Sequence, residues 1–201
     1  MTQKQSKVVM LHGRWPERID GQLIAEIPLC DSNNEGNWMG WTKKCLEAKD
    51  FDVTCPIVKN VWKARYEEWK EILDQLTINE NTILVGLSAG GYALLRWLSE
   101  TGKRVKKVIL IAPASKNIAN DPDRVKMPYE DEFYACEIAA SLKDQIQEQV
   151  VIIVSKDDEV AGRMYEGYVP LLNAKVVTLE NRGHFSFLIP ELPELLEEIL
   201  K

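Results

Sequence analysis

Six short runs of apolar, mostly β-branched residues recur along this chain of 201 residues. Each run is continuous rather than alternating with polar residues, which is typical of strands that are covered on both faces. Helical patterns lie between the runs. This alternation predicts an α/β fold: a doubly wound, mostly parallel sheet of about six strands with helices on both faces. The runs span residues 7–11, 51–55, 82–85, 108–111, 150–154 and 175–179.

Two of the helical patterns have a clear apolar face, because their large apolar residues recur at helical spacing in stretches that are otherwise charged. We expect one such face to consist of Trp62, Tyr66, Trp69, Leu73 and Leu76. We expect the other, at the end of the chain, to consist of Leu192, Leu195, Leu196, Ile199 and Leu200.

The length suits a single domain that spans residues 1–201, since no linker-like stretch divides the chain. Two connections are longer than such a fold requires, namely residues 14–37 and 113–132. Long loops in compact domains usually form functional rims or lids. Neither is long enough for a large cap domain, so we expect a fairly open active site.

The balance of charged residues indicates which classes of partner the protein can bind. The chain has 25 basic and 31 acidic residues, a formal net charge of -6, which argues against nucleic acid or an anionic membrane as partner. A small-molecule substrate is favoured, and a protein partner is possible. The first residues lack the apolar segment of a signal peptide, and no apolar run is long enough to span a membrane. We therefore expect a cytoplasmic protein.

Metal-binding patterns are absent from the sequence. The four cysteines, Cys30, Cys45, Cys55 and Cys136, form no C-x-x-C pair, and the chain has two histidines. We interpret the cysteines as free thiols and predict neither a metal nor a cofactor.

One segment carries a chemical signature. Residues 86–91 read Gly-Leu-Ser-Ala-Gly-Gly and lie between an apolar run and a helical pattern, so Ser88 is expected at the apex of a strand-turn-helix. A nucleophile on such a turn has a strained backbone and needs small neighbours, as in the G-x-S-x-G nucleophile elbow. Ser88 is therefore the predicted nucleophile.

A serine hydroxyl needs a base within hydrogen-bond distance, and the chain offers two histidines. His184 follows the last predicted strand, beside Gly183, at the edge where open α/β sheets place reactive groups. We predict His184 as the base. His12 ends the first strand, and we interpret it as a structural histidine of that turn.

The base needs an acid to orient it. The fifth run ends in Ser-Lys-Asp-Asp-Glu, whose carboxylates Asp157 and Asp158 emerge at the same sheet edge. The order Ser, Asp, His is expected when G-x-S-x-G opens a helix in a doubly wound sheet. Spacing alone does not separate the two aspartates.

The oxyanion that forms on attack needs backbone N–H donors. Ala89 follows the nucleophile at the start of the predicted helix, where the partial positive charge of the helix helps. The second donor should come from the loop after the first strand, where Gly13 lets the backbone turn tightly. We predict the N–H groups of Ala89 and Arg14 as the oxyanion hole.

Five motifs occur in one order over almost the whole chain. They are residues 8–13 (Val-Val-Met-Leu-His-Gly), Asn37-Trp38 before a helix with Trp41, Gly86 to Gly90, Val154 to Asp158 and Gly183 to Phe185. In these motifs the chain resembles the α/β-hydrolases, specifically the small serine hydrolases without a cap domain of the YdeN and retinoblastoma-binding-protein-like family.

The resemblance implies a choice of acid. In that family the catalytic acid is the carboxylate four positions before a Pro, a position held here by Asp158, with Gly162 where the Pro would stand. It also implies a serine hydrolase without a cofactor, but it implies no particular substrate.

Three residues are candidates for substrate binding. Leu87 stands where the family often has His, which predicts a more apolar floor. Trp38 is the candidate for a pocket wall. Trp15 and its neighbour Arg14 could contact an aromatic or anionic group, although a guanidinium beside an open cleft more often pairs with a surface carboxylate.

The sequence thus predicts a serine hydrolase with the triad Ser88, His184 and Asp158, acting on a small ester, thioester or amide. The alternative is a protein-binding module on a hydrolase scaffold with a weak or latent triad.

Overall fold

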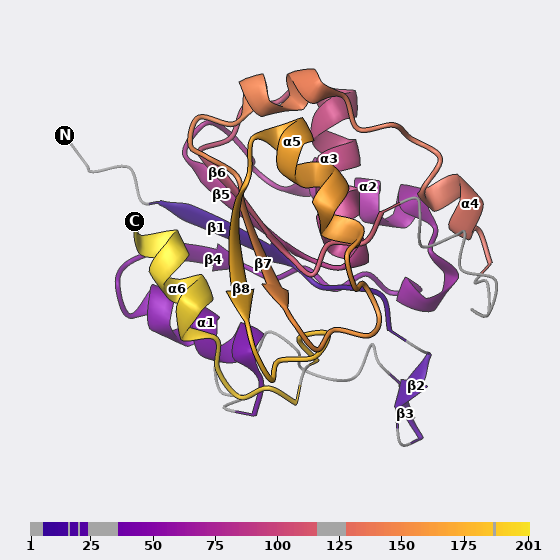
Figure 1. Ribbon diagram of the computed structural model, residues 1–201, viewed down its shortest axis with the longest axis vertical. Helices are drawn as coiled ribbons and strands as arrows, with labels where there is room; N and C mark the ends of the chain where they lie inside the picture. The colour runs from indigo at the N-terminus through magenta and orange to yellow at the C-terminus, as the bar shows by residue number, and fades with distance from the viewer. Residues whose placement is uncertain (1–5, 16, 20, 24–35, 116–127, 187) are drawn as a thin grey trace.

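A six-stranded, entirely parallel sheet forms the centre of the protein (Figure 1). The computed structural model describes residues 6–15, 17–19, 21–23, 36–115, 128–186 and 188–201. The strand order is β4-β1-β5-β6-β7-β8, and all six predicted strands are present. Their bounds are Lys7–Leu11 (β1), Asp52–Thr54 (β4), Thr82–Leu87 (β5), Lys107–Ile111 (β6), Val151–Ser155 (β7) and Lys175–Leu179 (β8).

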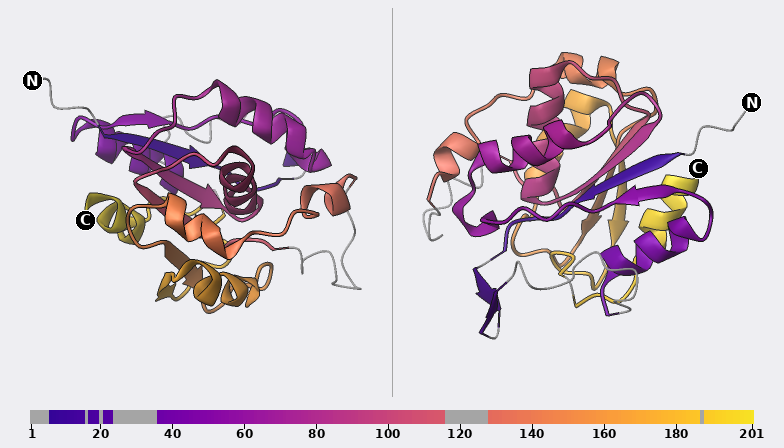
Figure 2. Two further views of the ribbon diagram at one scale, coloured as in Figure 1. Left: turned by 90° about the horizontal axis from the view of Figure 1, so that it is seen from above. Right: turned by 180° about the vertical axis from the view of Figure 1, so that it is seen from behind.

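Helices cover both faces of the sheet (Figures 1 and 2). Helices α2 (Tyr66–Gln75), α3 (Ala89–Thr101) and α5 (Tyr168–Leu172) pack on one face, and α1 (Trp38–Glu47) and α6 (Pro193–Leu200) on the other. The predicted doubly wound α/β fold is confirmed. The short elements are η2 (Val61–Lys63), α4 (Glu130–Phe133), η4 (Ala140–Gln145) and η5 (Met164–Gly167).

The two helical layers explain why the strand sequences are continuously apolar. In β1, Val9 and Leu11 belong to the core on the α3 side, whereas Val8 and Met10 belong to the core on the α1 side. Successive side chains of a strand point to opposite faces, so a strand covered on both faces has no polar alternation.

Two sequence predictions need correction. Trp62 lies in η2, separate from α2, because Ala64 between them has a left-handed backbone (φ 47°) that no continuous α-helix accommodates. Leu200 is 43% exposed, so the buried face of α6 is narrower than predicted. The predicted long connection after β1 also contains a small antiparallel hairpin, β2 (Arg18–Ile19) and β3 (Gln22–Leu23).

Much of the two predicted rim loops lies outside the described residues, namely 24–35 and 116–127, so their role stays a prediction. No helical cap is inserted over the sheet in the described ranges. The single domain over residues 1–201 also stays a prediction. Cys45, Cys55 and Cys136 are free thiols, whereas Cys30 lies outside the described residues.

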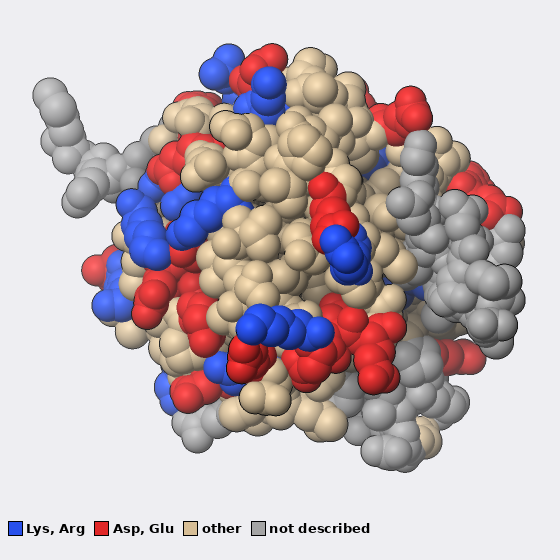
Figure 3. Space-filling view, in the orientation of Figure 1, with Lys and Arg blue, Asp and Glu red and all other residues tan. Residues whose placement is uncertain are grey.

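The surface is charged without strong segregation on the face shown in Figure 3, where acidic and basic side chains are interspersed. Lys156 and Glu180 form one such pair, with 2.5 Å between nitrogen and oxygen. Among the described residues, none of the helices combines the length and the apolar character needed to cross a bilayer.

The strand order determines where a site can form. After β1 the chain crosses to β4 on one side and then returns to β5 on the other side of β1. At such a reversal the carboxyl ends of two neighbouring strands open a crevice, the usual ligand position in open α/β sheets. Leu11 of β1 pairs with Gly86 of β5 at this point, so the segments after both strands meet there.

Candidate active site

Ser88 occupies the sharp turn between β5 and α3. Its backbone has φ 50° and ψ -118°, an unusual conformation for a residue with a side chain, and the serine is 9% exposed. The neighbouring glycines allow close packing around it: a Cβ on Gly86 would lie 2.5 Å from Gly91 Cα. The local sequence thus places a hydroxyl on a strained, tightly packed turn.

Two side chains form a hydrogen-bonded row with this hydroxyl. His184 Nε2 lies 3.0 Å from Ser88 Oγ, and His184 Nδ1 lies 2.9 Å and 3.1 Å from the two carboxylate oxygens of Asp158. An ionised carboxylate only accepts hydrogen bonds, so Nδ1 carries the proton and Nε2 is the acceptor facing the serine. This arrangement can remove a proton from Ser88.

Asp158 is buried, at 8% exposure, in the turn after β7. Its Oδ1 accepts hydrogen bonds from the backbone N–H groups of Val160 (2.8 Å) and Ala161 (2.9 Å). Burial works to raise the pKa of this carboxyl, but the hydrogen bond and electrostatic attraction of His184 and the two N–H groups outweigh it, so the pKa lies below its usual range. Asp158 is therefore held as the anion that His184 needs.

The neighbouring Asp157 has a different environment. It is exposed and bonds to the Ser155 hydroxyl and, at 3.2 Å, to the backbone N–H of Gly183. These contacts join the turn after β7 to the turn that carries His184. The hydrogen bond from Ser155 lowers the pKa of Asp157. The structure brings Asp158, not Asp157, into contact with His184.

The loop after β1 lies against the nucleophile. A Cβ on Gly13 would lie 3.2 Å from Ser88 Cβ, closer than most such contacts, so this loop packs tightly against the serine. Ala89 begins α3, where backbone N–H groups have no partner within the helix. Both predicted N–H donors, those of Ala89 and Arg14, thus belong to residues adjoining this contact.

His12 is the structural residue of this loop. It is buried, its Nε2 accepts the N–H of Val58 (3.0 Å), and Nδ1 donates to the Gly13 carbonyl (2.7 Å). C=O and N–H point in opposite directions across a trans peptide, so fixing the Gly13 carbonyl also orients the N–H of Arg14. Sequence reasoning interpreted His12 as structural but missed this orienting contact.

We expect His12 to make the protein less stable in mild acid. Burial lowers its pKa from 6.5 to about 4, so the unfolded chain binds this proton more readily than the folded one. The stabilisation is complete above pH 6.5 and is lost as the pH falls toward 4, about 2 kcal/mol between pH 7 and pH 4.5. Urea unfolding at both pH values measures it.

The matched variant is His12→Gln, whose amide oxygen can still accept the Val58 N–H but does not titrate. Its free energy of unfolding should fall less than that of the native protein over the same pH interval. Equal falls in the two proteins would contradict a buried, neutral His12.

The Arg14 side chain pairs within the protein. Its Nη1 lies 3.3 Å from the buried carboxylate of Glu130, and its guanidinium carbon lies 6.0 Å from the Tyr134 ring centre. This agrees with the alternative that we weighed, pairing with a carboxylate.

One predicted substrate contact is wrong, and a second has almost no exposed surface. Trp38 is 1% exposed, and its indole N–H donates to the carbonyl of Phe185 (3.1 Å), so it braces the His184 loop from inside the core instead of forming a pocket wall. Leu87 is 2% exposed and packs in the core on the α1 side, close to the Gly13 loop, so it offers almost no surface to a substrate. Trp15 is half-buried against both cores, and its contact with substrate stays a prediction.

Comparison with known proteins shows the family of the chain. The sequence pattern of the serine hydrolase family matches residues 28–188. The chain belongs to the serine hydrolase family. The match covers the nucleophile turn and both segments that carry the acid and the histidine.

Individual relatives show which members of the family the chain resembles. It is 25% identical over 159 residues to a protein of Bacillus subtilis (strain 168) named as hydrolase YdeN, covering 77% of this chain and 80% of that one. The crystal structure of the ydeN gene product from B. subtilis matches with a TM-score of 0.74 at 22% identity, over 98% of this chain and 97% of the other. The predicted resemblance to YdeN-like serine hydrolases is confirmed.

The fold is shared more widely. The carboxylesterase CesB (YbfK) from B. subtilis matches with a TM-score of 0.57 and 16% identity, over 98% of this chain and 83% of that chain. At this identity the likeness concerns the α/β-hydrolase fold. The family, shown by the sequence pattern, makes this protein a hydrolase of the serine class.

Proposed function

We propose that the protein hydrolyses a small carboxylic ester through an acyl-enzyme on Ser88, with His184 as base and Asp158 as the acid that orients it. The observation that carries the proposal is the continuous row from Asp158 through His184 to Ser88, with atom separations of 2.9 Å and 3.0 Å. Nucleophile, base and orienting acid within hydrogen-bond distance are the requirements for acyl transfer to serine.

In the first half of the reaction, Ser88 Oγ attacks the ester carbonyl carbon while His184 Nε2 takes its proton. The resulting imidazolium is stabilised by the Asp158 carboxylate. The C–O bond to the alcohol then breaks, and His184 gives the proton to the departing oxygen. The product of this half is an alcohol and an ester of Ser88.

In the second half, water replaces the alcohol. His184 removes a proton from the attacking water, the Ser88–acyl bond breaks, and the proton returns to Ser88 Oγ. The products are a carboxylic acid and the free enzyme, so no redox step or cofactor is required. Thioesters and amides undergo the same steps, but an amine leaves less readily than an alcohol, so we take the ester as substrate.

Both halves pass through a tetrahedral intermediate whose oxygen is negatively charged. We assign its stabilisation to the N–H groups of Ala89 and Arg14. The contact between Gly13 and Ser88 and the orientation of the Gly13 peptide by His12 support this assignment. A donor at the start of α3 gains from the partial positive charge of the helix.

A fluorophosphonate probe tests the proposal, because it phosphonylates only serines that a neighbouring base activates. We expect stoichiometric labelling of the native protein and none of Ser88→Ala or His184→Ala, with circular dichroism verifying that both variants are folded. Native protein that is folded yet unlabelled would reject the assembled triad and favour a protein-binding role on a hydrolase scaffold.

A further inference from the structure

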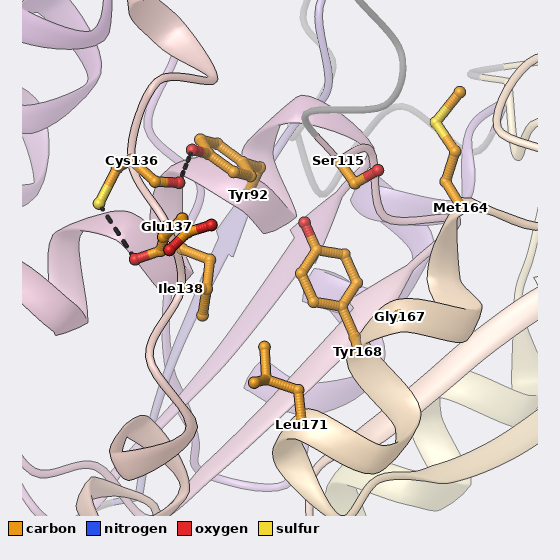
Figure 4. A pocket seen from close by; sticks show the side chains of 9 residues that line it. All are labelled: Tyr92, Ser115, Cys136, Glu137, Ile138, Met164, Gly167, Tyr168 and Leu171. Atoms are coloured by element: carbon orange, nitrogen blue, oxygen red, sulfur yellow. Dashed lines mark hydrogen bonds between the residues drawn. The ribbon is translucent and has the colours of Figure 1, made fainter. Parts of the chain in front are cut away.

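A cavity of about 360 Å³ lies between α3, the segment 136–138 and the η5–α5 helix (Figure 4). In Figure 4 the ring of Tyr168 stands opposite the loop segment with Ile138, and Ser115 and Met164 lie at one end while Leu171 lies at the other. Most of the lining is aromatic or aliphatic, including Tyr92, Ile138, Met164, Tyr168 and Leu171.

One wall of the cavity is bonded to the nucleophile turn. The Ser88 carbonyl accepts the backbone N–H groups of Tyr92 (3.3 Å) and Ala114 (3.2 Å). Tyr92 lines the cavity, and so does Ser115, the residue after Ala114. Two residues of the cavity wall are therefore connected, directly or through one neighbour, to the backbone of the residue that carries the reacting hydroxyl.

The opposite wall is bonded to the turn of the acid. The Ala161 N–H donates to the Asp158 carboxylate, and the Ala161 carbonyl accepts the N–H of Met164 (3.0 Å), which lines the cavity. Tyr168 links the two walls, because its hydroxyl donates to the Ala114 carbonyl (2.7 Å). The cavity is thus built from segments that also hold Ser88 and Asp158.

The side chains that line the cavity favour the binding of an uncharged group. The hydroxyls of Tyr92 and Tyr168 donate to the backbone carbonyls of Cys136 (2.6 Å) and Ala114, so their rings present apolar surface. Burial raises the pKa of both tyrosines, which therefore stay neutral. Glu137 is the lining residue with a carboxylate, and it opposes an anionic occupant.

We propose that this cavity receives the acyl group of the ester and that the acyl group is an uncharged hydrocarbon chain of medium length. The proposal rests on the proposed function. A cavity of about 150 Å³ already holds benzene, so the larger volume here admits a chain of several carbons.

Of the two parts of the ester, the acyl group is the one that remains bound longest and gains most from a pocket of its own. It stays bonded to Ser88 through both halves of the reaction, whereas the alcohol must leave after the first. The His184 side chain that protonates the alcohol is 23% exposed, so the alcohol has a path to solvent on that side. An apolar chain in the cavity is removed from water, which favours longer acyl groups.

Substitutions in the lining test the proposal. Gly167 and Leu171 lie one helical turn apart in the lining, and a Cβ on Gly167 meets no atom within 4 Å. Gly167→Phe and Leu171→Trp should therefore fill the cavity. The matched control is Ala139→Phe, which also introduces a phenyl ring, at an exposed residue beside Ile138 but outside the lining.

The readout is kcat/KM for p-nitrophenyl acetate, butyrate and octanoate. We expect the native protein and Ala139→Phe to prefer octanoate to acetate by about tenfold or more. Gly167→Phe and Leu171→Trp should lose about tenfold on octanoate while acetate changes by less than about threefold. Thermal unfolding of each variant verifies that the fold is retained.

Three outcomes would overturn the proposal. Hydrolysis of acetate with the same chain-length preference in all four proteins would reject the cavity as the acyl site and leave the proposed function standing. Losses on acetate and octanoate of the same size in the filling variants would reject the acyl assignment. No hydrolysis of any ester and no fluorophosphonate labelling would reject both proposals.

Discussion

Replacing Asp158 with Asn is expected to lower kcat for ester hydrolysis about 10⁴-fold while the fold is retained. The carboxylate now accepts a hydrogen bond from His184 Nδ1 at 2.9 Å. An Asn amide can donate to that nitrogen instead, which places the imidazole proton on Nε2, where it faces Ser88 and cannot accept the serine proton. Steady-state kinetics with a p-nitrophenyl ester measure the loss.

The matched control is Asp157→Asn, one residue earlier. Asp157 contacts the Gly183 N–H at 3.2 Å, and an amide oxygen can accept the same hydrogen bond. We expect kcat to fall less than about tenfold. Equal losses in the two variants would contradict the assignment of Asp158 as the orienting acid, as would full activity in Asp158→Asn.

Gly90→Ala is expected to lower the free energy of unfolding by more than about 3 kcal/mol, or to prevent folding. A Cβ at this position would overlap the carbonyl oxygen of His12 and lie 2.8 Å from that of Leu11. Both atoms belong to the backbone, which cannot move aside as a flexible side chain can. The substitution therefore has to push α3 away from β1. Urea unfolding with circular dichroism provides the measurement.

Gly167→Ala serves as the comparison for this effect. Gly167 has φ -64° and ψ -29°, which alanine adopts readily, and its Cβ would meet no atom within 4 Å. We expect a change between zero and a gain of about 1 kcal/mol, since alanine restricts the unfolded chain. Similar stabilities of the two alanine variants would show that the close approach at Gly90 is not a constraint on the fold.

The fold class could be predicted because each strand and helix has a recognisable pattern of apolar residues within its own short stretch of sequence. A strand covered on both faces must be apolar at every position, and six such runs alternate with helical patterns in the sequence. The strand order was not accessible in this way, because it depends on which neighbour each strand contacts. The hairpin of β2 and β3 was also missed, since each strand has two residues and carries no periodic pattern.

In the candidate site, too, the sequence predicted the features that depend on neighbouring residues and left open those that depend on folding. Ser88 stands in a motif whose small residues are needed locally, and the chain has two histidines from which to choose a base. Asp157 and Asp158 are adjacent carboxylates after one strand, which residue spacing cannot separate. Their roles differ because the turn directs Asp158 inward to His184 and Asp157 outward to the Gly183 N–H.

The wrong predictions concern the direction of side chains. Trp38 was expected at a pocket because it follows a long loop, but as the first residue of α1 it points into the core and binds the Phe185 carbonyl. The cavity was missed because its lining comes from residues as distant in the chain as Tyr92, Ile138 and Leu171. No sequence pattern joins them.

The sequence by itself thus determined the helices and strands, the parallel α/β class and the nucleophile turn. Each of these depends on residues close together in the chain: the spacing of apolar side chains in a helix or strand, and the small residues around a tight turn. Only the tertiary structure decided which carboxylate meets His184, that Trp38 supports the core, and where the cavity beside α3 lies. Those features depend on distances between segments that the chain brings together on folding, such as the 3.0 Å between His184 and Ser88.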